Sequence, residues 1–252
     1  MEVHHHSHHP KKWKEYISEF LMLFFAVFLG FMAEYYLEYK TERHKEHDYL
    51  VSMTEDLKAD TAEINSKLIA MGQLMNSGNL LTQMAYKKTW TDADIDSIYL
   101  HSILLVTRLV TINFTSGTID QLRNAGGFRL IRNNQIVKKI TDYEKGKSLI
   151  KVQQDAMSDK WNNVHNIQNS LLHLNVFAAT GKLGQVEYNK PMLDEISSIT
   201  GSKFLKKDRM SFYEYSNYIN VMKGYVAFYL NMAMMEKQQA VELIEVLEKE
   251  IH

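Results

Sequence analysis

Hydrophobic and polar positions separate one continuous apolar run from several segments with seven-residue periodicity. The run Phe20–Ala33 has fourteen residues without a charge, and within the longer stretch 16–37 only Glu19 and Glu34 interrupt it. At about 1.5 Å per residue, a helix from Tyr16 to Tyr35 spans roughly 28 Å, close to the thickness of a bilayer's hydrocarbon core. This stretch therefore predicts a transmembrane helix.

Aromatic residues flank the run, as in the interfacial belts of membrane helices. They are Trp13, Tyr16, Tyr35, Tyr36 and Tyr39. A cleavable signal peptide fits less well, because Phe31 stands two positions before Ala33, where cleavage requires a small residue. We therefore predict a His- and Lys-rich leader (1–15), one transmembrane helix (16–37) and a helical extramembrane domain (38–252).

Apolar columns with a period of seven predict long helices in that domain. The first column is Leu50, Leu57, Ile64 and Met71, and its half-polar companion is Thr54, Thr61, Leu68 and Met75. The polar stretch 76–79 is expected to weaken or end this helix. The column lies either inside one chain or between copies of the chain, and the sequence leaves both open.

The remaining chain predicts three further helical segments and one loop. Thr91 and Asp94 form a capping box ahead of an apolar face that includes Ile95, Ile98, Tyr99, Ile103, Val106, and Leu109 or Val110. A helix begins near Asn133 or Asn134, with the column Ile136, Tyr143, Ile150, Met157, Val164 and Leu171. Glycines and Pro191 predict a loop over 180–193.

The last helix is predicted over 211–250, with two columns. One is Tyr215, Met222, Tyr229, Glu236 and Leu243, and the other is Tyr218, Tyr225, Met232 and Leu247. The tyrosines have the spacing of packing residues. The predicted class is all-α, with the transmembrane helix continuing into an elongated antiparallel helical bundle.

Composition narrows the function. The chain has 252 residues with 29 basic and 30 acidic side chains, and this balance argues against a nucleic-acid partner. It has no cysteine, so disulfides, thiol catalysis and cysteine metal sites are excluded. We find no serine–histidine–acid order and no metalloprotease motif, and therefore predict a non-enzymatic protein with no required cofactor.

Histidines near the N-terminus are the candidate metal ligands: His4, His5, His6, His8 and His9. Imidazoles on a flexible leader are predicted to bind a divalent metal loosely. The alternatives are a purification tag, which the interrupting Ser7 disfavours, and a polar leader without a ligand. His44 with His47, and His165 with His173, are too sparse to form a site alone.

Small and acidic residues in the apolar run are the candidate contacts of the membrane helix. Ala26, Gly30 and Ala33 share a face, and small residues allow close approach of membrane helices. Glu19 and Glu34 bracket the run near the expected interfaces, and in an oligomer they would form acidic rings at a pore or interface. A plain lipid-facing anchor is the alternative.

The segment 121–133 (QLRNAGGFRLIRN) carries Gly126-Gly127 between helices. We interpret it as a helix–turn–helix corner. The alternative is a phosphate cradle with Arg123, Arg129 and Arg132, although no strand precedes the glycines as dinucleotide motifs require.

Two stretches resemble a known family. They are MEVHHHSHHPKKWKEYISEFLMLFFAVFLGFMAE at the N-terminus and TSGTIDQLRNAGGFRLIRNNQIVKKITDYEKG over 115–146. Together they are similar to an uncharacterised family of single-pass membrane proteins of Bacteroidetes, which joins a His-rich leader and a phenylalanine-rich anchor to a helical domain with a Gly-Gly turn. The resemblance implies a native His tract and a bacterial inner membrane, and it implies no activity.

Three functions are consistent with these features. The first is a membrane-anchored oligomeric scaffold or accessory subunit of a membrane complex. The others are a homo-oligomeric channel, and a metal or ligand sensor acting through a partner. Lysine and arginine counts on the two sides of the run are tied, so orientation rests on the short basic leader. It favours a cytoplasmic N-terminus and a periplasmic helical domain.

Overall fold

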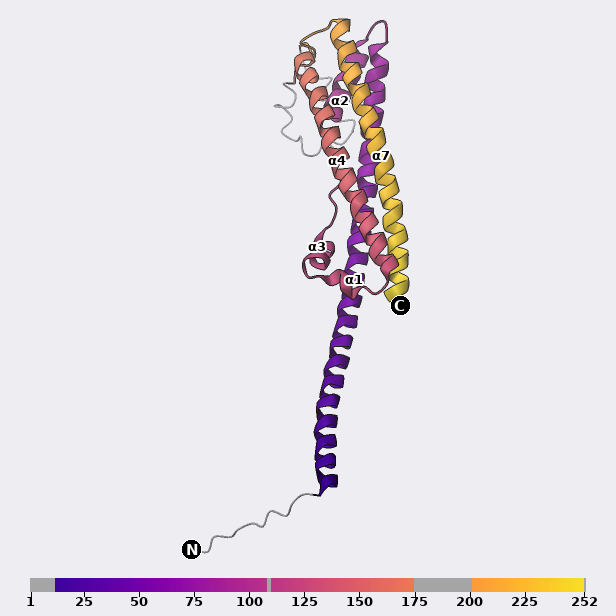
Figure 1. The fold of residues 1–252 in the computed structure, drawn as a ribbon. Coiled ribbons are helices and arrows are strands. Elements are labelled where there is room, and N and C mark those ends of the chain that lie inside the picture. Colours follow the sequence, from indigo (N-terminus) through magenta and orange to yellow (C-terminus); the bar gives the residue numbers. More distant parts are fainter. Residues whose placement is uncertain (1–11, 108–109, 175–200, 252) are drawn as a thin grey trace, which may run out of the picture.

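The structure is a computed structural model that describes residues 12–107, 110–174 and 201–251. Its elements are helices α1 (Trp13–Ala85), α2 (Asp92–Thr107), α3 (Gly117–Asn124), the short 3₁₀ helix η1 (Gly127–Leu130), α4 (Asn134–Leu171) and α7 (Arg209–Ile251) (Figure 1). Apart from one isolated bridge between Leu172 and Phe204, the described residues form no β-structure. The predicted all-α class is confirmed.

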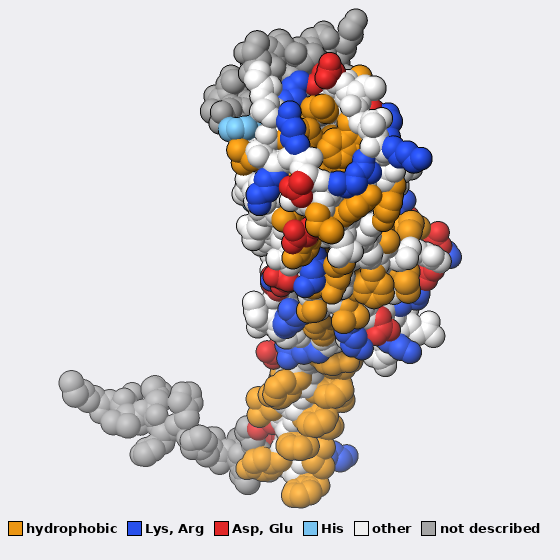
Figure 2. Space-filling model, turned by 90° about the horizontal axis from the view of Figure 1, so that it is seen from above, with side chains coloured by type: hydrophobic (Ala, Val, Ile, Leu, Met, Phe, Trp, Pro, Cys, Tyr) orange, Lys and Arg blue, Asp and Glu red, His pale blue; other side chains and the backbone are white. Residues whose placement is uncertain are grey.

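Helix α1 has two parts. Residues 13–41, which we call the projecting segment, extend away from the other helices, and all their side chains are exposed (Figure 1). Residues 42–85 pack with α2, α3, α4 and α7, and we call this packed part of the molecule the helical body. Figure 2 shows hydrophobic side chains covering the projecting segment, whereas charged side chains are scattered over the helical body.

The projecting segment lies in the one described helix that is long and apolar enough to cross a membrane. An 18-residue window of α1 has a mean hydropathy of 2.0, and none of that window is buried. This finding rests on length and composition.

The polar stretch 76–79 does not end α1, contrary to that part of the prediction. The helix continues to Ala85, and Ser77 and Gly78 are buried. A Cβ at Gly78 would lie 3.1 Å from the Lys223 side chain and 3.4 Å from that of Ile219, so α7 approaches closely here. Packing against α7 thus outweighs the weak helix propensity of these residues.

The apolar columns of α1 and α4 form the core of the helical body. Leu50, Leu57, Ile64 and Met71 are all buried within one chain, and so is the whole predicted column of α4 from Ile136 to Leu171. They pack with α7 in two adjoining clusters. The α1 column is therefore intramolecular, which resolves the alternative that the sequence left open.

Predicted helix starts agree with the structure. The Thr91 backbone N–H donates to an Asp94 carboxylate oxygen at 2.8 Å, and the Asp94 N–H donates back to the Thr91 hydroxyl at 3.3 Å. Asn133 caps α4 by accepting from the Gln135 N–H at 3.0 Å. The Val106 and Leu109 side chains and the predicted loop 180–193 lie outside the described residues.

Helix α7 uses only one of its two predicted columns for the core. Every member of the Tyr215 column is buried, including Glu236. In the second column only Leu247 is buried, while Tyr218 is 38% exposed. The expectation that these tyrosines pack in the core is wrong for Tyr218, because α1 and α4 cover one side of α7 and leave the other open.

Candidate functional site

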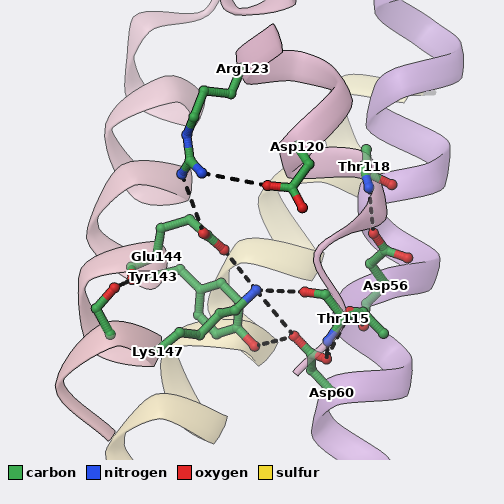
Figure 3. A network of polar contacts seen from close by, with 10 residues as sticks. Asp56, Asp60, Thr115, Thr118, Asp120, Arg123, Tyr143, Glu144 and Lys147 are labelled. Atoms are coloured by element: carbon green, nitrogen blue, oxygen red, sulfur yellow. Dashed lines mark hydrogen bonds and ion pairs between the residues drawn. The ribbon is translucent and has the colours of Figure 1, made fainter. Parts of the chain in front are cut away.

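A network of charged and polar side chains lies inside the helical body (Figure 3). We call four of its members, together with the neighbouring Glu236, the ionic cluster: Asp60 on α1, Tyr143, Glu144 and Lys147 on α4, and Glu236 on α7. Three helices contribute to the cluster, so its geometry depends on how they pack.

Lys147 is the cation of the cluster, and its side chain is only 12% exposed. Its Nζ lies 2.7 Å from Glu144 Oε1 and 4.0 Å from Asp60 Oδ2, and it donates to the Thr115 carbonyl at 2.6 Å. The same ammonium lies 5.6 Å from the centre of the Phe114 ring. These partners offset the hydration that a buried ammonium loses.

Asp60 accepts three hydrogen bonds in the core. The donors are the Tyr143 hydroxyl at 2.8 Å, the Thr115 N–H at 2.7 Å and the Thr115 hydroxyl at 2.8 Å. Burial, followed by the charge of Asp60, raises the pKa of Tyr143 well above its usual value. Tyr143 therefore remains a hydrogen-bond donor at physiological pH.

Glu236 is a buried acidic residue. Its side chain is only 3% exposed, and its Oε1 has no hydrogen-bond partner in the described structure. It faces Gly146, where any Cβ would overlap its carboxyl group. Burial raises the pKa of Glu236 to about 8, although the nearby Lys147 charge opposes the rise and Glu144 and Asp60 add to it. The carboxyl is thus largely protonated at neutral pH.

The extended segment 110–116, which we call the strap, runs beside the cluster between α2 and α3. Carboxylates of α1 accept backbone N–H groups from the strap and from the first turn of α3: Asp60 from Thr115 of the strap, and Asp56 from Thr118 of α3 at 3.1 Å. A chain without regular structure needs such partners when it is buried. The acids of α1 therefore serve to fix the strap.

A polar column on α4 holds the other side of the strap and the end of α2. Its members are Lys147, Gln154, Trp161 and Gln168, spaced by seven. Gln154 accepts from the Ile112 N–H at 3.1 Å, while Trp161 donates to the Leu105 carbonyl at 3.2 Å and Gln168 to that of Ser102 at 3.1 Å. Sequence reasoning missed this polar column. Its period of seven is the same as that of the apolar α4 column, whose members stand four positions earlier in the sequence.

A cleft of about 430 Å³ adjoins the cluster. Its lining includes Asn113, Phe114, Arg123, Lys147, Lys151 and Gln154. Arg123 is engaged by Asp120 at 3.5 Å and Glu144 at 3.6 Å (Figure 3). The polar groups here are largely satisfied by one another, so the arrangement stabilises the meeting of three helices and the strap.

The candidate residues of the projecting segment are all exposed. A Cβ at Gly30 would meet no atom within 4 Å, so none of the described residues packs on Gly30, and Ala26 and Ala33 on the same face are exposed as well. Glu19 is exposed near the start of the segment. Glu34 lines an open groove of about 680 Å³, together with Lys45 and Arg129, where the projecting segment meets the helical body.

The Gly-Gly segment forms a tight corner. Gly126 has φ 62°, the left-handed conformation that glycine tolerates best. A Cβ at Gly127 would come within 3.0 Å of the Leu122 side chain, so the second glycine permits close packing. Arg123 pairs with acids and Arg132 lies over the Tyr39 ring at 4.6 Å, so these arginines face different surroundings. The geometry favours the corner over the phosphate cradle.

The histidine predictions have different outcomes. The tract His4, His5, His6, His8 and His9 lies outside the described residues. His44 lies 3.6 Å from Asp48 on an exposed surface, and His165 stacks on Trp161 with ring centroids 5.5 Å apart. Across residues 12–107, 110–174 and 201–251, no group of three or more potential ligands is placed to hold a metal ion.

Comparison of the chain with protein-family models, with curated proteins and with solved structures finds no match.

Proposed function

We propose that this protein is a non-enzymatic, membrane-anchored helical scaffold, acting as an oligomer or as an accessory subunit of a membrane complex. The observation that carries the proposal is the continuity of α1. One uninterrupted helix contains both an exposed apolar segment of membrane-spanning length and a long segment that packs in the helical body.

Exposure of the projecting segment supports anchoring in a bilayer. Large apolar side chains on all its faces are exposed, among them the consecutive Phe20, Leu21, Met22 and Leu23. Soluble monomers rarely expose apolar surface of this extent, because each buried CH₂ group gains about 0.8 kcal/mol. A lipid environment covers the whole circumference, which a single protein partner does not.

The junction supports a rigid mounting of the helical body on its anchor. Buried Glu46 pairs with Arg43 at 2.6 Å and accepts the Arg132 N–H at 2.8 Å. These contacts fasten α1 to the start of α4 about one turn above the projecting segment. A body fixed in this way presents constant lateral faces to neighbours in the same membrane, as a scaffold requires.

The ionic cluster supports a structural role. Lys147 binds the Glu144 carboxylate and the strap carbonyl of Thr115, and Asp60 accepts the Thr115 N–H, so these charged groups are used to hold the chain together. We therefore propose that no cofactor is needed. Loose binding of a divalent metal by the His tract is compatible with the scaffold and is separate from it.

The proposed location is the bacterial inner membrane, with the leader cytoplasmic and the helical body periplasmic. A reporter that functions only after export, fused after His252, should be active. Residues 1–15 should resist protease added from outside. Activity of a cytoplasm-specific reporter at His252 would reverse the orientation.

Purification of the full chain from membranes in mild detergent tests the function. We expect a mass above that of one chain, or co-purification of a membrane complex in fixed ratio. A single chain without partners at every detergent concentration contradicts the proposal. The channel alternative requires conductance of the purified protein in planar bilayers, and the sensor alternative requires a partner that carries the output.

A further inference from the structure

Helix α7 carries a second apolar face that the other described residues cover only in part, with Tyr225 and Met232 half-buried against the core. Its members are Tyr218, Val221, Tyr225, Phe228, Met232 and Met235, which alternate steps of three and four residues. Phe228 is 57% exposed and Met235 is 65% exposed. This face and the exposed Leu149 and Val152 of α4 constitute what we call the outer face.

Contacts between α4 and α7 place these side chains in one stretch of the helical body. Gly146 of α4 faces Glu236, and the Lys160 ammonium lies 5.6 Å from the centre of the Tyr225 ring. Leu149 and Val152 lie between Gly146 and Lys160 on α4, as Phe228 and Met235 lie between Tyr225 and Glu236 on α7. The two helices therefore contribute to the same surface.

The outer face is unusual in charge as well as in exposure. Between Glu214 and Glu236, Lys223 is the only charged residue. Its side chain is directed to α1, with Nζ 3.5 Å from the Thr82 hydroxyl and its methylene groups against Gly78. Depletion of charge combined with aromatic and methionine side chains is typical of the core of a protein interface.

We propose that two copies of this chain pair side by side through the outer face, in parallel and in register; the inference rests on the proposed membrane-anchored oligomer. Three-four spacing over these eighteen residues is the repeat by which parallel identical helices pack. In such a pair every residue near the axis meets its own copy, so a charge there would face a like charge. The scarcity of charge on α7 suits a second copy of the same face, and Lys160 beside Tyr225 is paired with Asp159 at 2.9 Å.

The anchor supplies the geometry of this pairing. Helix α7 runs along the long axis of the body that α1 supports, so the outer face points sideways (Figure 1). Copies anchored in one membrane share their orientation and meet through lateral faces. Anchoring also confines the copies to two dimensions, which raises their effective concentration.

Symmetric cysteine cross-linking of the full chain in isolated membranes tests the inference. The natural chain has no cysteine, so a single Phe228→Cys or Met235→Cys forms a disulfide only with another molecule. Ile69→Cys is the matched control, because Ile69 is an equally exposed apolar residue on α1. Under copper-phenanthroline oxidation we expect a product of twice the chain mass from the two α7 variants, about tenfold more than from the control.

Other outcomes overturn the pairing. Equal cross-linking at all three positions indicates random collision, and a product of another mass indicates that a different protein covers the face. Absence of product at 228 and 235 indicates coverage by the same chain, such as residues 175–200, or no coverage. Mass in detergent distinguishes the two failures: an oligomer without these cross-links refutes only the outer face, whereas a monomer refutes the oligomeric scaffold.

Discussion

The two parts of α1 are both α-helical, but they distribute their apolar residues differently. In the projecting segment all side chains are exposed, and apolar residues occur on every face. In residues 46–85 apolar residues keep a seven-residue period, and one face is buried while the other is polar. The difference shows that the distribution of apolar residues on a helix reflects its surroundings. Apolar residues on all faces suit lipid, whereas a single apolar stripe suits packing on a protein core.

The largest expected effect comes from placing one charge in each part. Leu57→Asp puts an unpaired carboxylate in the core at a cost on the order of 4 kcal/mol, and we expect the helical body to unfold in circular dichroism. Leu29→Asp, in the projecting segment, should leave the melting temperature of the body unchanged and reduce retention in carbonate-washed membranes. A folded Leu57→Asp monomer would mean that the α1 column lies between chains.

Lys147→Met should have the next largest effect. It leaves the Asp60 and Glu144 carboxylates without their cation, which we expect to cost about 3 kcal/mol in unfolding by denaturant. Lys151→Met, at an exposed position one turn later, is the control and should change stability little. Equal stabilities of the two variants would show that the ionic cluster does not hold the three helices together.

Glu236 makes the helical body sensitive to pH. Its pKa is raised in the folded state to about 8, so the folded protein binds more protons than the unfolded chain between the ordinary glutamate value and pH 8. Stability should therefore fall as pH rises through that window, by at most about 1.4 kcal/mol per pH unit. Glu236→Gln should flatten this dependence, whereas exposed Glu242→Gln should preserve it; a wild-type protein that gains stability over the window would refute the assignment.

Gly30→Leu should have a smaller effect, confined to association. Bulk at this position separates helices that approach through Ala26, Gly30 and Ala33, with an expected loss of about 1 kcal/mol in dimerisation measured in detergent. Phe28→Leu, on the opposite side of the projecting segment, should change association little. Unaltered association of Gly30→Leu would make the segment a plain lipid-facing anchor.

The smallest effect on stability is expected from the leader. Replacing His4, His5, His6, His8 and His9 with alanine should abolish retention of the untagged protein on immobilised nickel. The melting temperature should stay the same, because a polar leader adds nothing to the core. A large drop in melting temperature would reveal a structural role for the tract.

Periodicity predicted the helices well where core packing repeats along one element. The α4 column from Ile136 to Leu171 is an example, because α7 supplies residues to both core clusters that its members enter. Periodicity failed where another element decides the local structure. Helix α7 packs on Gly78, and α1 therefore continues through the polar stretch 76–79.

The ionic cluster could not be predicted from spacing alone. Asp60 and Lys147 belong to helices far apart in the sequence, and their polar character is equally typical of solvent-facing positions. Only Glu236 gave a sequence signal, since it interrupts an otherwise apolar column of α7. The two faces of α7 were likewise indistinguishable by period, and only the packing of α1 and α4 decides which is covered.

Labelling of single cysteines along α1 in intact membranes tests the central claim most directly. A membrane-impermeant maleimide can reach any exposed side chain in water, and both Leu29 and Ile69 are exposed in the structure. We predict that Ile69→Cys is labelled from the side of the membrane that holds the helical body and that Leu29→Cys is protected until detergent is added. Labelling of Leu29→Cys as fast as Ile69→Cys before detergent would contradict the division of α1 into an anchor and a helix of the body.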